Sequence, residues 1–156
     1  MPYNVLDVCR YIVKYSDDKN NWISNLKLQK LLYFIQAFFL INKDECCFSE
    51  KIEAWEFGPV VPEAYHHFKR YGGVSIPAIE GKYYMNDDCE VEGEFDDTVI
   101  ADDDKKMIRH MVDRLSRYTA SFLVDVTHKQ DPWIKAYKPH NNNEITPESI
   151  KEFFKK

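Results

Sequence analysis

One segment of this sequence is apolar around almost its whole circumference. Residues 25–42 read NLKLQKLLYFIQAFFLIN, with leucine, isoleucine and phenylalanine recurring at helical spacing. The remaining aromatic and aliphatic residues of the segment widen that stripe beyond one face. A helix of this kind is stable in water only when other elements cover it on all sides. The pattern therefore predicts that residues 25–42 form the buried central helix of a bundle.

Several shorter segments are suited to cover this helix. Each joins apolar residues at helical spacing to a start signal, such as Asn, Asp or Thr at the cap or Pro in the first turn. Residues 48–57 alternate with the period of a strand, and residues 74–97 indicate a β-hairpin or a long loop. The sequence therefore predicts a mainly α, single-domain helical bundle over residues 1–156, with a small β element formed by a short strand and a β-hairpin. The further helices are expected at residues 4–16, at 62–71, at 102–118, at 121–127, from 131 and from 147.

Length and hydropathy place bounds on the kind of protein. A chain of 156 residues and 18.5 kDa has room for one domain. The N-terminus lacks a basic region followed by an apolar stretch, so we expect no signal peptide. The longest strongly apolar segment, residues 31–41, is shorter than the about 18–20 residues that a membrane span needs. We expect a soluble, cytoplasmic protein without a membrane partner.

Charge is distributed unevenly along the chain. The formal net charge is −5, which argues against a nucleic-acid binder. Residues 44–104 contain 17 Asp or Glu and four Lys or Arg, a net charge of −13 between two basic ends. One interpretation is an acidic surface that meets a basic partner. The other, which we favour at this point, is a solvated loop rich in carboxylates.

Motifs of known catalytic or metal chemistry are missing. The sequence has no G-x-S-x-G, no H-E-x-x-H and no glycine-rich phosphate loop, and Cys46 and Cys47 are adjacent rather than spaced as zinc ligands. His128 near Asp131 is compatible with a catalytic base, but such a histidine more often bonds between helices. The aspartates at 102–104 are expected to cap a helix. We expect a protein that binds no metal and no cofactor and is not an enzyme.

Three passages resemble a known family. They are LKLQKLLY at 26–33, EAWEFGPVVPEAY at 53–65 and THKQDPW at 127–133. In content and order they are similar to the Panacea, or SocA-like, antitoxin domain, which also occurs in phage-associated proteins. The resemblance implies a cytoplasmic antitoxin of a toxin–antitoxin system that neutralises a cognate toxin protein by direct binding. For one subgroup it implies a proteolytic adaptor that delivers the toxin to a ClpXP-type protease.

The matching passages also predict a binding site. Gly58-Pro59 and Pro62 restrict the backbone of residues 58–62, which we call the GPVVP corner, and a pre-ordered surface loses little entropy on binding. Gln29 is expected to hydrogen-bond a backbone carbonyl or this corner. An alternative function is a small-molecule-binding protein or enzyme with its site between the corner and His128. The residues proposed to bind the partner are Lys27, Gln29, Lys30, Tyr33, Trp55, Gly58, Pro59, Val60, Val61, Pro62, Tyr65, His128 and Trp133.

Overall fold

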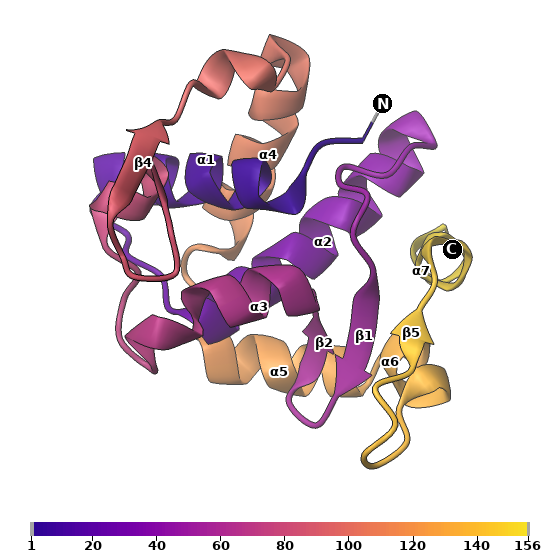
Figure 1. Cartoon of the computed structure of the whole chain (residues 1–156). Coiled ribbons are helices and arrows are strands. Elements are labelled where there is room, and N and C mark those ends of the chain that lie inside the picture. The colour runs from indigo at the N-terminus through magenta and orange to yellow at the C-terminus, as the bar shows by residue number, and fades with distance from the viewer. Residues whose placement is uncertain (1, 156) are drawn as a thin grey trace.

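The central helix is α2, Asn25–Lys43, which runs diagonally through the molecule (Figure 1). The computed structural model describes residues 2–155, and in it almost all side chains from Asn25 to Leu40 are buried. The helix begins where the Ser24 side chain accepts a hydrogen bond from the Lys27 amide, and it ends at Asp44, whose φ is 57°. The prediction of a buried central helix is confirmed.

Residues 2–155 form six further α-helices around α2, and one cluster of buried apolar side chains connects the helices of this part of the chain. Their starts follow ordinary capping chemistry: Asn4, Thr119 and Thr146 each accept a bond from an amide in the first turn. None of the helices in residues 2–155 combines the length and apolarity needed to cross a membrane. The helices are α1 (Val5–Asp18), α3 (Pro62–Phe68), α4 (Asp102–Leu115), α5 (Ala120–His128), α6 (Asp131–Ala136) and α7 (Pro147–Phe154).

Two small antiparallel sheets complete the fold, and they confirm the predicted β elements. In the first, strand β1 (Ile52–Trp55) lies between β2 (Gly58–Val60) and β5 (Glu144–Ile145). The second pairs β3 (Tyr83–Met85) with β4 (Val91–Glu94). The GPVVP corner, for which no strand was predicted, contributes to the first sheet. Its first three residues form β2, paired with β1 across a turn at Glu56 and Phe57.

The elements lie on two sides of α2. Figure 1 shows α1, α4 and the β3–β4 hairpin towards one end of the molecule, and α3, α5 and the β1–β2 hairpin towards the other. The short helix α6 and strand β5 lie beside β1, and α7 packs on α2. The acidic segment, residues 44–104, contributes to both ends of the molecule. Residues 87–94, where its carboxylates are densest, lie on the exposed β3–β4 hairpin.

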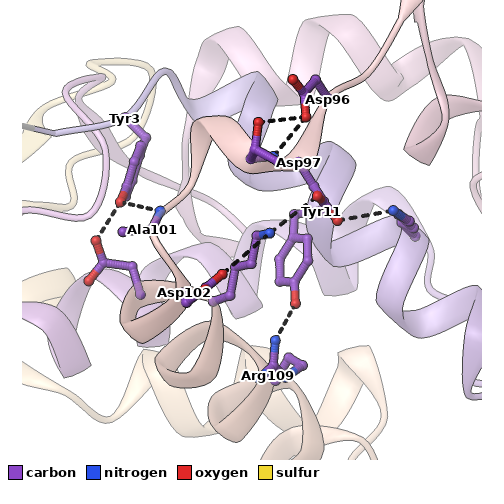
Figure 2. A network of polar contacts seen from close by, with 11 residues as sticks. Tyr3, Tyr11, Asp96, Asp97, Ala101, Asp102 and Arg109 are labelled. Atoms are coloured by element: carbon purple, nitrogen blue, oxygen red, sulfur yellow. Dashed lines mark hydrogen bonds and ion pairs between the residues drawn. The ribbon is translucent and has the colours of Figure 1, made fainter.

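A network of polar side chains joins α4 to α1 (Figure 2). The Arg109 guanidinium donates to the Tyr11 hydroxyl over 2.7 Å, and Asp97 pairs with Lys14 and Lys105 at 3.0 and 3.2 Å. These contacts fix the segment that enters α4.

The aspartates at the start of α4 do not cap it, contrary to expectation. The capping position is Ala101, which offers no side-chain acceptor. Asp104 instead pairs with Lys43 of α2 at 2.6 Å and accepts a hydrogen bond from Tyr3. The triplet therefore supplies negative charge to the first turn, and its last member forms a partly buried ion pair between α4 and α2.

Gln36 shows how α2 holds irregular chain segments in place. It is buried, and its Oε1 accepts from the Cys47 amide at 2.7 Å and the Phe48 amide at 3.3 Å. Its Nε2 donates to the Phe48 carbonyl at 3.2 Å. Backbone groups of a loop would otherwise lie unpaired in the core, which costs about 1–3 kcal/mol for each group.

We therefore expect Gln36→Met to lower the free energy of unfolding by about 2–4 kcal/mol, because it keeps the volume but removes these hydrogen bonds. Urea unfolding at neutral pH measures the change. Leu31→Met is the matched control, a swap between apolar side chains on the same buried helix that should cost less than about 1.5 kcal/mol. Equal costs for the two variants would contradict the role given to Gln36.

Candidate functional site

Gln29 connects α2 to the GPVVP corner. Its Oε1 accepts the Val61 amide at 2.9 Å, and its Nε2 donates to Asn25 Oδ1 at 2.8 Å. Asn25 in turn donates to the Tyr65 carbonyl at 3.1 Å. The prediction that Gln29 bonds the corner is confirmed, with the backbone amide as its partner. This relay fixes the position of the strand-to-helix bend relative to α2.

Lys30 of α2 also hydrogen-bonds the GPVVP corner. Its side chain is fully buried, and Nζ donates to the Pro59 carbonyl at 2.9 Å. Burial lowers the pKa of this ammonium group to about 7. Gly58 leaves the space that the lysine needs, because a Cβ at that position would lie 2.8 Å from Lys30 Cε and 2.9 Å from Thr127 Oγ1. Its φ of 105° is also one that other residues rarely adopt.

Side chains of helices α5 and α6 hydrogen-bond the turn of the β1–β2 hairpin. His128 Nε2 donates to the Glu56 carbonyl at 2.8 Å, and Trp133 Nε1 donates to the Trp55 carbonyl at 2.7 Å. The His128 and Trp133 rings lie against each other, with centroids 4.2 Å apart. Both bonds end on backbone carbonyls at the turn, so the turn is fixed in space.

Two more polar side chains of α2 reach the segments around α5. Tyr33 donates to Gln130 Oε1 at 2.8 Å, and burial raises the pKa of its hydroxyl. Lys27 Nζ donates to the Ser116 carbonyl at 2.9 Å, and burial lowers the pKa of its ammonium group. These bonds place α5, and with it His128, against α2.

The three sequence passages thus meet in one place, but most of their residues are inside the molecule. A buried side chain presents no surface to a partner, so the buried residues among them support the hairpin from inside the molecule. The buried residues of the predicted site are Lys27, Gln29, Lys30, Tyr33, Gly58, Pro59, Val60 and Val61, and the half-buried ones are Trp55, Pro62, Tyr65, His128 and Trp133.

The exposed part of the site is aromatic. Phe57, at the hairpin turn, is 61% exposed. Behind it, Trp55 packs edge-on against Tyr65 at 5.1 Å, and Trp133 stacks on Tyr137 at 4.6 Å. We call these five residues the hairpin face. Beside it lies a recess of about 350 Å³, lined in part by Trp55 and Tyr137.

Sequence reasoning missed Phe57 and Tyr137. A signal for Phe57 was present, since it is a large apolar residue directly before a glycine and between two short extended segments. Tyr137 carries no such signal, because its stacking on Trp133 depends on where α6 ends.

The geometry gives His128 a structural partner. Its ring N–H donates a hydrogen bond to the Glu56 carbonyl, and its ring packs against that of Trp133. Within residues 2–155, no three His, Cys, Asp or Glu side chains come together in an arrangement that could hold a metal ion. The five side chains of the hairpin face are all aromatic.

Taken together, these features define a small, mainly helical domain in which a buried helix positions a β-hairpin with an aromatic tip. The sequence model of the family described as "Antitoxin SocA-like, Panacea domain" matches residues 28–134, which is most of the chain. The chain belongs to this family.

One curated relative is Antitoxin SocA of Caulobacter vibrioides (strain NA1000 / CB15N). It is 50% identical over 50 residues, which is 32% of this chain and 27% of the length of that protein. The match thus spans about a quarter of the curated relative. No solved structure matches the chain.

We expect Gly58→Ala to lower the free energy of unfolding by about 2–4 kcal/mol, because the methyl group meets Lys30 and the backbone is strained. Two other glycines separate these causes. Gly72 has φ 58° and Gly73 lacks a positive φ, and a Cβ at either would meet nothing within 4 Å. Gly72→Ala should cost about 1 kcal/mol and Gly73→Ala close to nothing. Thermal or urea unfolding of all three tests the order, which fails if Gly58→Ala costs no more than Gly72→Ala.

Lys30→Met tests the buried ammonium group through pH. An unfolded lysine keeps its proton to about pH 10.4, whereas folded Lys30 has a pKa of about 7. Between these values the unfolded state binds more protons, so rising pH stabilises the wild type relative to the variant. The gain is at most about 1.4 kcal/mol per pH unit.

Urea unfolding of both proteins at about pH 6, 8 and 9.5 spans this window. Lys129→Met, at an exposed lysine, controls for the loss of a positive charge as such. A constant stability difference between wild type and Lys30→Met across the series would show that Lys30 is not desolvated in the fold.

Proposed function

We propose that this chain is a non-catalytic antitoxin that neutralises a cognate toxin protein by binding it through the hairpin face. Membership of the SocA-like antitoxin family supports the antitoxin role. The name of the curated relative, Antitoxin SocA, points the same way. The structural observation that carries the choice of surface is Phe57, whose ring is 61% exposed on a hairpin fixed from three sides.

The fixed hairpin is suited to binding for a physical reason. Ordering a flexible loop on association costs free energy, and a loop that is already ordered avoids that cost. Here Lys30, His128 and Trp133 each donate a hydrogen bond to a backbone carbonyl of the hairpin. The backbone that carries Phe57 is therefore already ordered before a partner binds. Aromatic side chains in such positions carry a large share of the binding energy in protein interfaces.

Electrostatics favour a basic toxin. The β3–β4 hairpin and its turn carry exposed carboxylates at Asp87, Asp88, Glu90, Glu92 and Glu94. A field of one sign increases the rate of association with a partner of the opposite sign, and salt reduces this effect. Delivery of the toxin to a ClpXP-type protease is a second form of neutralisation that the family resemblance suggests. It also begins with capture of the toxin, so it uses the same surface in this proposal.

The test is co-expression with the product of the neighbouring reading frame, with growth as the readout and pull-down as the binding assay. Phe57→Ser should weaken toxin binding at least about tenfold and abolish rescue, while the melting temperature stays close to that of the wild type. Val91→Ser is the matched control, since Val91 is 51% exposed on β4, away from the β1–β2 hairpin (Figure 1). It should bind and rescue normally.

Two results would count against the proposal. If Phe57→Ser is folded and rescues growth as well as Val91→Ser does, the hairpin face is not the contact. If the neighbouring product is not toxic and no toxin is captured, the antitoxin role itself fails. Val60 is a poor probe of the contact, because it is 4% exposed and a polar substitution there disrupts the core.

A further inference from the structure

A second surface of the molecule is apolar and hollow, and it shares no residue with the hairpin face. Two hollows, of about 710 and 260 Å³, are both lined by Phe34 of α2. The first lies between α4 and α5, and the second continues along α2 as far as Ile41 beside α7. We call the two together the α2 groove. Phe122 and Ile41, which line its two parts, are 48% and 41% exposed.

The floor of the groove has the dimensions of a helix-binding site. Phe34, Phe38 and Ile41 lie at i, i+4 and i+7 on α2, so they share one face of that helix and span about 10 Å along it. Beyond them the first hollow adds the exposed ring of Phe122, stacked on Tyr118 at 4.9 Å. Amphipathic helices bind such grooves with apolar residues at i, i+3, i+4 and i+7.

Two arginines lie at the edge of the first hollow, at the C-terminal end of α4. Arg114 of α4 and Arg117, which follows the helix, are exposed, and both line this hollow. Arg114 has no ion pair among residues 2–155. The one carboxylate in that lining, Asp113, already accepts hydrogen bonds from the Tyr15 hydroxyl at 2.8 Å. The lining thus carries two arginines against one aspartate, and Arg117 also donates a hydrogen bond to the Tyr118 hydroxyl at 3.1 Å.

We propose that the α2 groove binds an amphipathic helix of a partner protein, with its apolar face on Phe38, Ile41 and Phe122 and acidic residues facing Arg114 and Arg117. Apolar contact supplies the affinity, and the arginines select the orientation and the charge of the bound helix. The inference is independent of the proposed function, because it concerns another surface and another kind of contact.

The probe is a fluorescein-labelled synthetic helical peptide with leucine at i, i+3, i+4 and i+7 and glutamate along one flank. A second peptide carries lysine in place of each glutamate. Fluorescence anisotropy with the full chain should show the acidic peptide binding at least about tenfold more tightly than the basic one. The affinity for the acidic peptide should fall as salt rises.

Variants then place the peptide in the groove. Arg114→Glu with Arg117→Glu should weaken the acidic peptide at least about tenfold and improve the basic one, and Phe122→Ser should weaken both. The matched control replaces two exposed lysines elsewhere, Lys69→Glu with Lys135→Glu, and should leave both affinities unchanged. All these sites are exposed, and circular dichroism verifies that each variant is folded.

Three results of the binding assay overturn the proposal. They are equal affinity for the two peptides, no detectable binding of the acidic peptide to the folded wild type, and binding that survives the arginine reversals. A dimer in sedimentation that the Phe122→Ser variant loses would assign the groove to a second copy of the chain, which also overturns it. Phe57→Ser should bind the peptide normally, so failure of the hairpin face and failure of the groove are told apart.

Discussion

The structure depends on hydrogen bonds from buried side chains of α2 to the backbones of the segments around it. Where loops, turns and short strands pack on a buried helix, they bring backbone groups into the core that they cannot pair among themselves. Lys27, Gln29, Lys30 and Gln36 supply the missing partners, at Ser116, Val61, Pro59 and residues 47–48. A buried backbone group without a hydrogen bond destabilises the fold by about 1–3 kcal/mol. Arrangements of the surrounding chain that lose these bonds are therefore disfavoured.

This arrangement separates the support from the surface that it presents. Side chains of α2, α5 and α6 donate hydrogen bonds to the backbone of the β1–β2 hairpin, and Phe57 at its turn is exposed to solvent. The α2 groove follows from the same construction on another face, where the helix is covered incompletely and Phe38 and Ile41 remain partly exposed. A central helix with buried polar residues can therefore position two separate surfaces at once.

Much of the fold could be predicted from the sequence, because its signals are local. The apolar periodicity of residues 25–42 predicts the buried helix α2, and the capping residues predict where the other helices begin. The bond from Gln29 to the GPVVP corner is predicted because Gln29 is a polar residue among apolar neighbours. Strand β2 was missed because Pro59 suggests a break, yet β2 is at the edge of its sheet, where proline is tolerated. The burial of Val60 and the exposure of Phe57 depend on how the hairpin sits over Lys30, a long-range contact that spacing does not encode.

The bonds at the hairpin tip also have an evolutionary consequence. Lys30 and His128 hold carbonyl oxygens of Pro59 and Glu56, and Trp133 holds that of Trp55. A carbonyl is common to every amino acid, so these bonds impose no identity on the side chains at the turn. Positions 56 and 57 are therefore free to drift while the fold is conserved. One inherited scaffold can in this way present different recognition surfaces in different lineages without a loss of stability.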